Sequence, residues 1–186
     1  GRLDKNEELR ERFLRHCRLS PGEVWTDPIR GHRVGILDAT SPAGLSAITA
    51  GERVGLSVND PPYNLVPGGG SSRHLGRLPI SQYIAFSRAW VGAVSGVLSD
   101  AAHFYVWLGA DVRRGFEPLP DFIMMMRDVD GLSPRNYITV RNQRGYGTQS
   151  TWMWVRQELL HYVRGRPDFT VVYTEIPKVL RGYYKA

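Results

Sequence analysis

The stretch Val54-Gly55-Leu56-Ser57-Val58-Asn59-Asp60-Pro61-Pro62-Tyr63-Asn64 decides the fold. Its first five residues form a short apolar run that is typical of a buried strand. The two prolines lack the N–H groups that a β-ladder needs, so the strand must end before them. A carboxylate and an aromatic ring therefore follow the carboxyl end of a strand, which is where open α/β sheets bind ligands.

Strand and helix patterns alternate on both sides of this stretch. A second short apolar run ends at Asp38 and predicts another buried strand, and Ser81 is a candidate cap for a helix with an apolar stripe. Such alternation predicts an α/β fold with a mixed, mostly parallel sheet. The expected elements are a helix at 6–17 within an N-terminal segment 1–20, strands at 33–37 and 54–58, a helix at 81–98, a strand at 103–109 and a helix at 118–128.

Two further regions of the chain differ from the rest in composition. Residues 64–80 contain Gly68-Gly69-Gly70 and predict a mobile loop. Residues 135–186 predict a β-meander, with strands at 137–141, 158–163 and 169–173. This last region holds 9 Lys or Arg against 3 Asp or Glu, whereas residues 1–134 hold 15 of each. A basic surface of this kind favours contact with phosphates.

The bulk properties fit one folded domain over residues 1–186. The chain has 186 residues, of which 42% are hydrophobic and 23% charged. Its single cysteine, Cys17, excludes an internal disulfide and a multi-cysteine metal site, so we expect no metal. No signal peptide and no membrane-spanning apolar run is visible, so we expect a cytoplasmic protein.

The residues after the strand at 54–58 suit methylation of an amino group. An exocyclic amino nitrogen on a base is a poor nucleophile because its lone pair is delocalised into the ring. If the Asp60 carboxylate and the Pro61 carbonyl accept its two protons, the lone pair is free to attack a methyl sulfonium. A target base must leave the duplex, which costs a few kcal/mol, and stacking on the Tyr63 ring would return about 1–3 kcal/mol.

Asp60-Pro61-Pro62-Tyr63 after a buried strand resembles the catalytic motif of the amino methyltransferases, and its aspartate form is typical of the adenine enzymes. The order of elements over residues 30–175 is similar to that of the β-class DNA methyltransferases. This resemblance implies the class I methyltransferase sheet, present here in part, with S-adenosylmethionine (SAM) as cofactor and double-stranded DNA as substrate. It also implies that Asp60, Pro61, Pro62 and Tyr63 are catalytic and that Asp38 and Asp60 contact the cofactor. The implied role is a restriction-modification or regulatory methylase that flips its target adenine.

The chain departs from that family in one respect. It has no Phe-x-Gly-x-Gly loop, which in the family receives the methionine end of the cofactor. Three interpretations follow: a missing C-terminal segment carries the loop, a second polypeptide supplies it, or this half is catalytically silent. In the last case the chain would be a non-catalytic DNA-binding or assembly subunit.

Other activities and other residues stay open at this stage. Cytosine-N4 methylation of DNA is the neighbouring alternative, and guanine-N2 methylation of RNA is disfavoured because those enzymes place the glycine-rich loop before the catalytic motif. A histidine such as His161 is interpreted as an ordinary exposed or core residue, since the histidines lack ligand spacing. The residues expected to contact DNA phosphates are Arg73, Arg77, Arg141 and Arg144.

Overall fold

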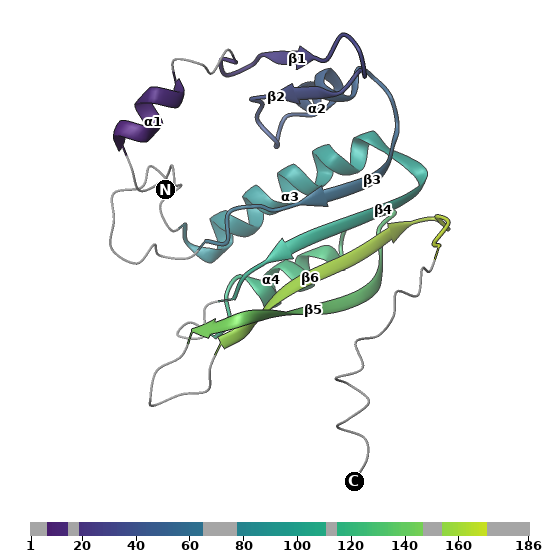
Figure 1. Ribbon diagram of the computed structural model, residues 1–186. Helices are drawn as coiled ribbons and strands as arrows, with labels where there is room; N and C mark the ends of the chain where they lie inside the picture. The colour runs from purple at the N-terminus through teal and green to yellow at the C-terminus, as the bar shows by residue number, and fades with distance from the viewer. Residues whose placement is uncertain (1–6, 15–18, 65–77, 111–114, 147–153, 171–186) are drawn as a thin grey trace.

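The computed structural model of the protein describes residues 7–14, 19–64, 78–110, 115–146 and 154–170. A four-stranded sheet carries two helices on one face, and a small two-stranded sheet with its own helix lies beside it (Figure 1). The expected α/β fold with a mixed sheet is confirmed. None of the helices in the described ranges is long and apolar enough to cross a membrane.

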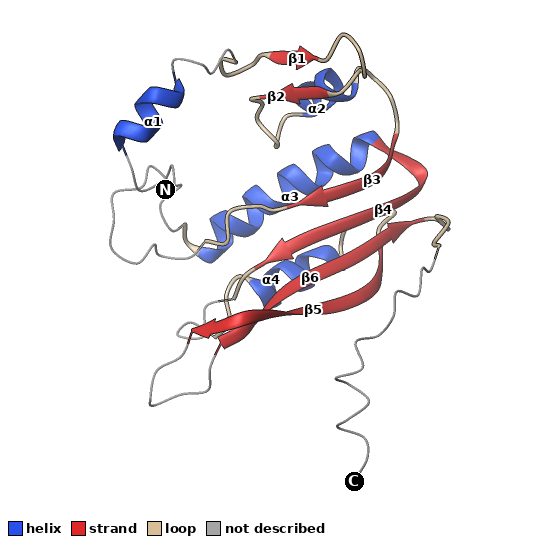
Figure 2. Cartoon of the chain, viewed as in Figure 1, coloured by secondary structure: helices blue, strands red, loops and turns tan. Residues whose placement is uncertain are grey.

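The larger sheet has the strand order β3-β4-β6-β5 (Figure 2). Parallel pairing joins β3 to β4, and antiparallel pairing joins β4 to β6 and β6 to β5. At the middle of the sheet, Tyr105 of β4 lies opposite both Val58 and His161. The bounds are Val54–Asn59 for β3, Leu98–Leu108 for β4, Ser133–Tyr146 for β5 and Trp154–Arg164 for β6.

The core lies between this sheet and the helices α3 (Ile80–Val97) and α4 (Leu119–Met126). Alternate residues of β4 point into it, as the period of two in a strand requires. The ring of Trp90 lies nearly parallel to those of Phe104 and Phe122, with centroids 6.0 Å away in both cases. Both helices were expected, α3 from its apolar stripe, and they cover the inner face of the sheet.

The outer face of the sheet is less covered than the sequence predicts. Leu56 and Val58 of β3 are 54% and 62% exposed, so the prediction of a buried strand at 54–58 is right in position and wrong in burial. The physical reason is that β3 is an edge strand of the described sheet, and only its other face is turned toward the core.

The prediction of a buried strand at 33–37 is right in position and wrong in burial. Strand β2 (Arg33–Gly35) pairs only with β1 (Val24–Thr26) within the described residues, in a separate antiparallel sheet, and Val34 remains 54% exposed. Gly31, with φ of 71°, lies in the turn between the two strands. Its first strand, β1, was not expected from the sequence.

The start of α3 also differs from expectation. The helix begins at Ile80, its N-cap is Pro79, and no side chain caps it, so Ser81 lies inside the first turn. The extended ψ of 142° at Pro79 supplies the change of direction that a capping residue normally provides.

The first helix, α1, spans Glu7–Leu14 and confirms the expected N-terminal helix.

The C-terminal meander is confirmed in its first two strands. β5 and β6 pair from Ser133↔Val163 to Tyr146↔Trp154. The third expected strand at 169–173 is not found at residues 169–170, and the rest of it lies outside the described residues. Most of the predicted loop at 64–80 also lies outside them, since only Asn64 and residues 78–80 are described.

The turn after β6 gives a testable prediction. Gly165 has φ of 55°, and a Cβ there would meet the carbonyl oxygen of Asp100. We expect Gly165→Ala to lower the free energy of unfolding by about 1–3 kcal/mol, measured by urea denaturation. Gly22→Ala is the matched control, because Gly22 has φ of 94° but nothing within 4 Å of the added Cβ. Equal effects of the two substitutions would contradict a role for the contact with Asp100.

Candidate active site

The predicted motif lies at the carboxyl edge of the parallel strand pair. Asp60 follows the last residue of β3, and Gly109 follows the last residue of β4. Asn59 lies opposite Val106 in the register, so the segments that leave the two strands begin at the same edge of the sheet. The Asp60 side chain is exposed, which leaves it accessible to a ligand.

Within the motif, the Tyr63 hydroxyl hydrogen-bonds to the Asp60 carboxylate. Burial of the half-buried Tyr63 ring raises the pKa of its hydroxyl well above the usual value, and the hydrogen bond and negative charge of Asp60 raise it further. The hydroxyl is therefore neutral near pH 7 and acts as a donor. The Asp60 oxygens and the Tyr63 ring thus form one small polar and aromatic surface.

The backbone of the motif is fixed at three points. The buried Tyr83 hydroxyl of α3 donates to the Pro62 carbonyl oxygen at 2.6 Å. Before the motif, the side-chain amide of Asn59 donates through Nδ2 to the Tyr105 carbonyl oxygen at 2.9 Å. After it, the Asn64 side chain accepts from the Leu78 N–H at 2.8 Å and donates to the Leu78 carbonyl at 2.9 Å. None of these three anchors was identified from the sequence.

Asp38 lies apart in a local turn. It follows β2 and precedes α2 (Pro42–Thr49), a helix that was not expected from the sequence although Ser41 caps it and Pro42 begins it. One carboxylate oxygen of Asp38 accepts from the Thr40 N–H at 2.9 Å and from the Thr40 hydroxyl at 2.7 Å. These two bonds lower the pKa of Asp38, so the exposed side chain is ionised at neutral pH. The geometry is that of a turn residue with an exposed carboxylate.

The basic residues predicted to contact DNA are only partly placed. Arg73 and Arg77 lie outside the described residues. Arg141 and Arg144 belong to β5, but the described part of the structure does not include their side chains. Their role in binding phosphates therefore stays a prediction. Within the described residues, no group of three or more His, Cys, Asp or Glu side chains is arranged to hold a metal ion.

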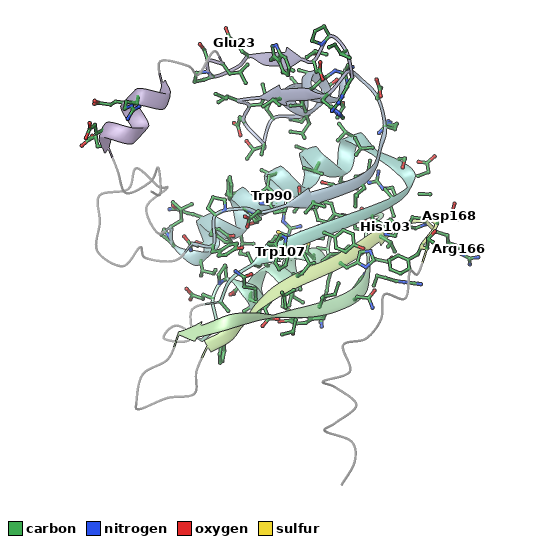
Figure 3. All side chains as sticks on the ribbon, viewed as in Figure 1. Glu23, Trp90, His103, Trp107, Arg166 and Asp168 are labelled. Atoms are coloured by element: carbon green, nitrogen blue, oxygen red, sulfur yellow. The ribbon has the colours of Figure 1, made fainter. Side chains whose placement is uncertain are left out.

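A pair of histidines on the outer face of the sheet was missed. His103 Nδ1 lies 3.0 Å from His161 Nε2, and His103 Nε2 lies 3.0 Å from the carbonyl oxygen of Asp168, a proximity that Figure 3 also shows. Because a carbonyl only accepts, His103 Nε2 is the donor to Asp168, and one proton lies between His103 Nδ1 and His161 Nε2. The His161 ring also stacks on Tyr105 with centroids 4.2 Å apart. Sequence spacing could not reveal the pair, because it arises from the β4–β6 register.

The histidine pair gives a prediction about pH. Burial, His103 and Arg135 lower the pKa of His161 below its ordinary 6.5, so folding favours the neutral ring. The unfolded state then binds more protons below that value, and stability is lost as pH falls through the ordinary pKa toward the lowered one. We expect urea denaturation of the native protein to show this loss as pH falls below about 6.5, with a slope of at most about 1.4 kcal/mol per pH unit for one proton.

His161→Gln is the variant that checks the assignment. It removes the titrating group and should flatten this part of the pH profile, whereas the exposed His32→Gln should leave the profile as it is. An unchanged profile in His161→Gln would contradict the assignment to His161.

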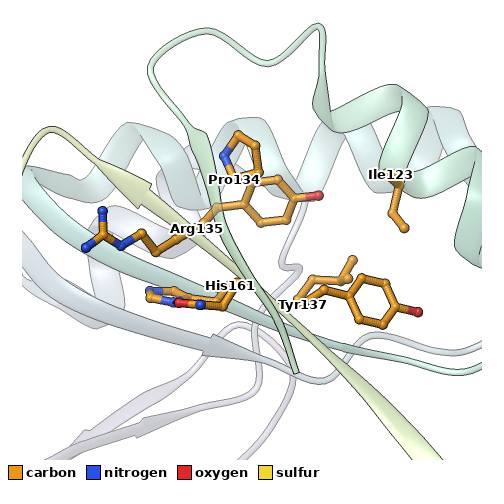
Figure 4. Close-up of a pocket in the computed structure, with 8 residues that line it drawn as sticks. Ile123, Pro134, Arg135, Tyr137 and His161 are labelled. Atoms are coloured by element: carbon orange, nitrogen blue, oxygen red, sulfur yellow. The ribbon is translucent and has the colours of Figure 1, made fainter. Parts of the chain in front are cut away.

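A cavity lies on the β5 side of the same region. It is open to solvent, has a volume of about 200 Å³ and is shown in Figure 4 with the residues around it. The register shift between Pro134 and Asn136 marks a β-bulge at Arg135, which shapes this part of its wall. No residue of the predicted motif lines the cavity. Its lining consists of Ile123, Pro134, Arg135, Asn136, Tyr137, Leu160, His161 and Tyr162.

Comparison with known proteins gives structural neighbours only. No family model and no curated protein matches the chain. Two structures of M1.HpyAVI, one of them a complex with SAM, align with TM-scores of 0.44 and 0.42 at 11% and 9% identity over 67% of this chain. A protein from Thermus thermophilus, provisionally named a DNA modification methylase, aligns with a TM-score of 0.41 at 20% identity over 76% of this chain.

The alignments also differ in how much of each neighbour they include. They cover 52% and 53% of the two M1.HpyAVI chains and 62% of the Thermus thermophilus chain. This chain thus spans between about half and three fifths of the length of those proteins. At such TM-scores the likeness is too loose to support an argument about function.

Proposed function

We propose that the chain carries the catalytic part of a SAM-dependent DNA methyltransferase that acts on the exocyclic N6 of adenine. The observation that carries this proposal is the placement of Asp60-Pro61-Pro62-Tyr63 at the carboxyl edge of the parallel β3–β4 pair, with the Asp60 carboxylate exposed. Ligands of open α/β sheets bind at this edge. The same residues carry the resemblance to the amino methyltransferases.

The chemistry assigned to these residues is the activation of an amino nitrogen. The Asp60 carboxylate and the Pro61 carbonyl accept hydrogen bonds from the two amino protons, so the nitrogen lone pair turns out of conjugation with the ring. Bound SAM would supply the methyl carbon that this nitrogen attacks, and the electron pair of the carbon–sulfur bond would remain on sulfur. One proton then leaves the methylated nitrogen for solvent. The face of Tyr63 supports the flipped base by stacking.

SAM supplies the electrophilic methyl group when bound. The residues of this chain suit one part of that cofactor, its ribose. Asp38 offers an exposed, ionised carboxylate, with one oxygen held by Thr40, that suits a hydroxyl donor such as those of a ribose. The sequence contains no Phe-x-Gly-x-Gly loop for the methionine end, so the proposal includes a second segment or polypeptide that completes the cofactor site.

The proposed substrate is double-stranded DNA. The excess of basic residues at 135–186 supports this proposal, because Lys and Arg that neutralise phosphates release counterions and favour binding. Arg73, Arg77, Arg141 and Arg144 are the proposed phosphate contacts. Restriction-modification or regulatory methylation, with base flipping, is the proposed setting.

The test is transfer of labelled methyl from SAM to duplex DNA. The chain is assayed alone and with its encoded continuation or neighbouring polypeptide, and each mixture is repeated with Asp60→Ala. We expect label in DNA that is lost in the variant. Absence of label in every mixture would contradict the enzymatic proposal.

One sequence observation favours a second candidate function. The lack of the cofactor loop is also consistent with a non-catalytic subunit that binds DNA or assembles with an active partner. Such a subunit would bind DNA equally well before and after Asp60→Ala, with no methyl transfer in any mixture. DNA binding and label incorporation measured on the same samples therefore separate the two candidates.

A further inference from the structure

Two residues outside the predicted motif contact it directly. Tyr83 belongs to α3 and Gly109 follows β4, so the contacts come from two different elements. We propose that Tyr83 and Gly109 are positioning residues for the Asp60–Tyr63 segment: the Tyr83 hydroxyl holds the Pro62 carbonyl, and the missing side chain at Gly109 makes room for the Tyr63 ring. This inference rests on the proposed function and names residues that set the geometry of its site.

The segment needs an outside anchor because of its own composition. Pro61 and Pro62 have no N–H group, so neither can donate to a neighbouring strand. Their carbonyl oxygens are therefore the only backbone groups of these two residues that can take part in a hydrogen bond. The hydrogen bond from Tyr83, at 2.6 Å, holds the second of these carbonyls.

Tyr83 is well suited to hold that carbonyl. Its side chain is 1% exposed and forms part of the core, with the Phe86 ring centroid 6.2 Å away. Burial raises the pKa of Tyr83 to about 12, whereas the nearby Ser87 hydroxyl acts in the opposite direction. The hydroxyl therefore stays protonated and remains a donor. Since the ring is fixed by packing, the position of its oxygen fixes the Pro62 peptide group.

Gly109 has no side chain, and the Tyr63 ring lies close to the position that a side chain would take. A Cβ built on Gly109 would lie 2.8 Å from Tyr63 Cδ2, 3.2 Å from Cγ and 3.4 Å from Cβ. Rotation of the ring moves Cδ2 but leaves Cγ and Cβ in place, so the contact at 3.2 Å would remain. The Tyr63 backbone or side chain would have to move, and with it the hydroxyl that bonds to Asp60.

The flanking residues restrict how far the segment can adjust. Asn59 is tied to the Tyr105 carbonyl on one side, and Asn64, with φ of 54°, is tied to both backbone groups of Leu78 on the other. A shift of Pro62 or Tyr63 therefore changes the geometry of Asp60–Tyr63, the short stretch that carries the proposed chemistry. Errors of about 1 Å in such geometry can cost about 100-fold in rate.

The first experiment compares Tyr83→Phe and Gly109→Ala with matched controls in the methyl-transfer assay. Tyr83→Phe keeps the ring and removes only the hydroxyl, and Tyr162→Phe makes the same change at a buried tyrosine of β6 while leaving the Pro62 bond in place. Gly55→Ala is the control for Gly109→Ala, because an added Cβ at this strand glycine meets nothing within 4 Å. We expect kcat to fall about 10- to 100-fold in the two test variants, with KM within about threefold, and no such fall in the controls.

A second experiment follows the Tyr63 ring without using activity. Fluorotyrosine placed at position 63 is titrated by fluorine NMR, since its lower intrinsic pKa brings the titration into a range that the fold tolerates. Displacement of the ring in Gly109→Ala removes its burial and its contact with Asp60, so its pKa should fall toward that of free fluorotyrosine. The pKa in Gly55→Ala should match that of the unsubstituted chain.

The outcomes separate this inference from the proposed function. Unchanged kcat in Tyr83→Phe and Gly109→Ala, with Asp60→Ala inactive, would overturn the positioning role and leave the proposed function standing. No methyl transfer by the unsubstituted protein in any mixture would overturn the proposed function. In that case the NMR titration still decides the geometry, because an unchanged Tyr63 pKa in Gly109→Ala would overturn the part assigned to Gly109.

Discussion

Asp60→Asn should lower kcat for methyl transfer by about 100- to 1,000-fold, because it removes the negative charge that is proposed to accept the amino protons. The substitution keeps the size and shape of the side chain. It also keeps an oxygen that can accept the Tyr63 hydroxyl, so the local structure should persist. The measurement is the single-turnover rate of label transfer from SAM to DNA, with binding of both substrates determined on the same preparation.

Asp130→Asn is the control for this substitution. Asp130 is an exposed carboxylate in the turn before β5, far along the chain from the motif, and its loss should leave the rate unchanged. A rate for Asp60→Asn within about threefold of the unsubstituted protein would contradict the role assigned to the carboxylate.

Trp90→Ala should produce the largest loss of stability, about 3–5 kcal/mol in the free energy of unfolding. Trp90 is 3% exposed and packs between the sheet and α4, with the Phe104 and Phe122 rings both nearly parallel to its own. Figure 3 labels its place in this layer. Removal of the indole leaves a cavity that these two rings can fill only in part. Urea denaturation followed by far-ultraviolet circular dichroism measures the change.

Met124→Ala in α4 is the comparison for that prediction. Met124 is 55% exposed, so its truncation removes little buried apolar surface and should cost less than about 1 kcal/mol. Trp90→Phe should lie between the two, and it also removes an indole N–H that has no hydrogen-bond partner within the described residues. A loss below about 1 kcal/mol for Trp90→Ala would contradict the central place of Trp90 in the core.

The parts of the fold that could be predicted from the sequence are those with a strong period. The apolar stripe of α3 includes Tyr83, Trp90 and Val94, all of which are buried. β4 alternates buried and half-buried residues from Ala102 to Leu108, as a strand covered on one face should. In both cases the side chains that make the core also carry the pattern, so local sequence and tertiary packing agree.

The parts that could not be predicted depend on short signals or on pairing. β1 and β2 have only three residues each, too few for a period to be visible. The helix α2 was missed although Ser41-Pro42 is a recognisable start, because it has only eight residues and none of them is buried. The burial of β3 could not be inferred either, since it depends on which elements cover the sheet.

The residues of the candidate site also divide into those that the local sequence reveals and those that only the fold brings together. Asp60, Pro61, Pro62 and Tyr63 could be identified because they follow one another and because two prolines mark the end of a strand. Tyr83 is 21 residues from Pro62 in the chain, and Gly109 is 46 residues from Tyr63. The local sequence does not predict these contacts. The histidine pair likewise follows from a register that only the folded sheet defines.

The central claim is that this chain directs a methyl group to the amino nitrogen of adenine. The most direct measurement is mass spectrometry of nucleosides from duplex DNA incubated with isotope-labelled SAM, the chain and its encoded continuation or neighbour. We predict labelled N6-methyladenine that disappears with Asp60→Asn. Label in N4-methylcytosine would contradict the adenine assignment, and unlabelled DNA in every mixture would contradict the methyltransferase itself.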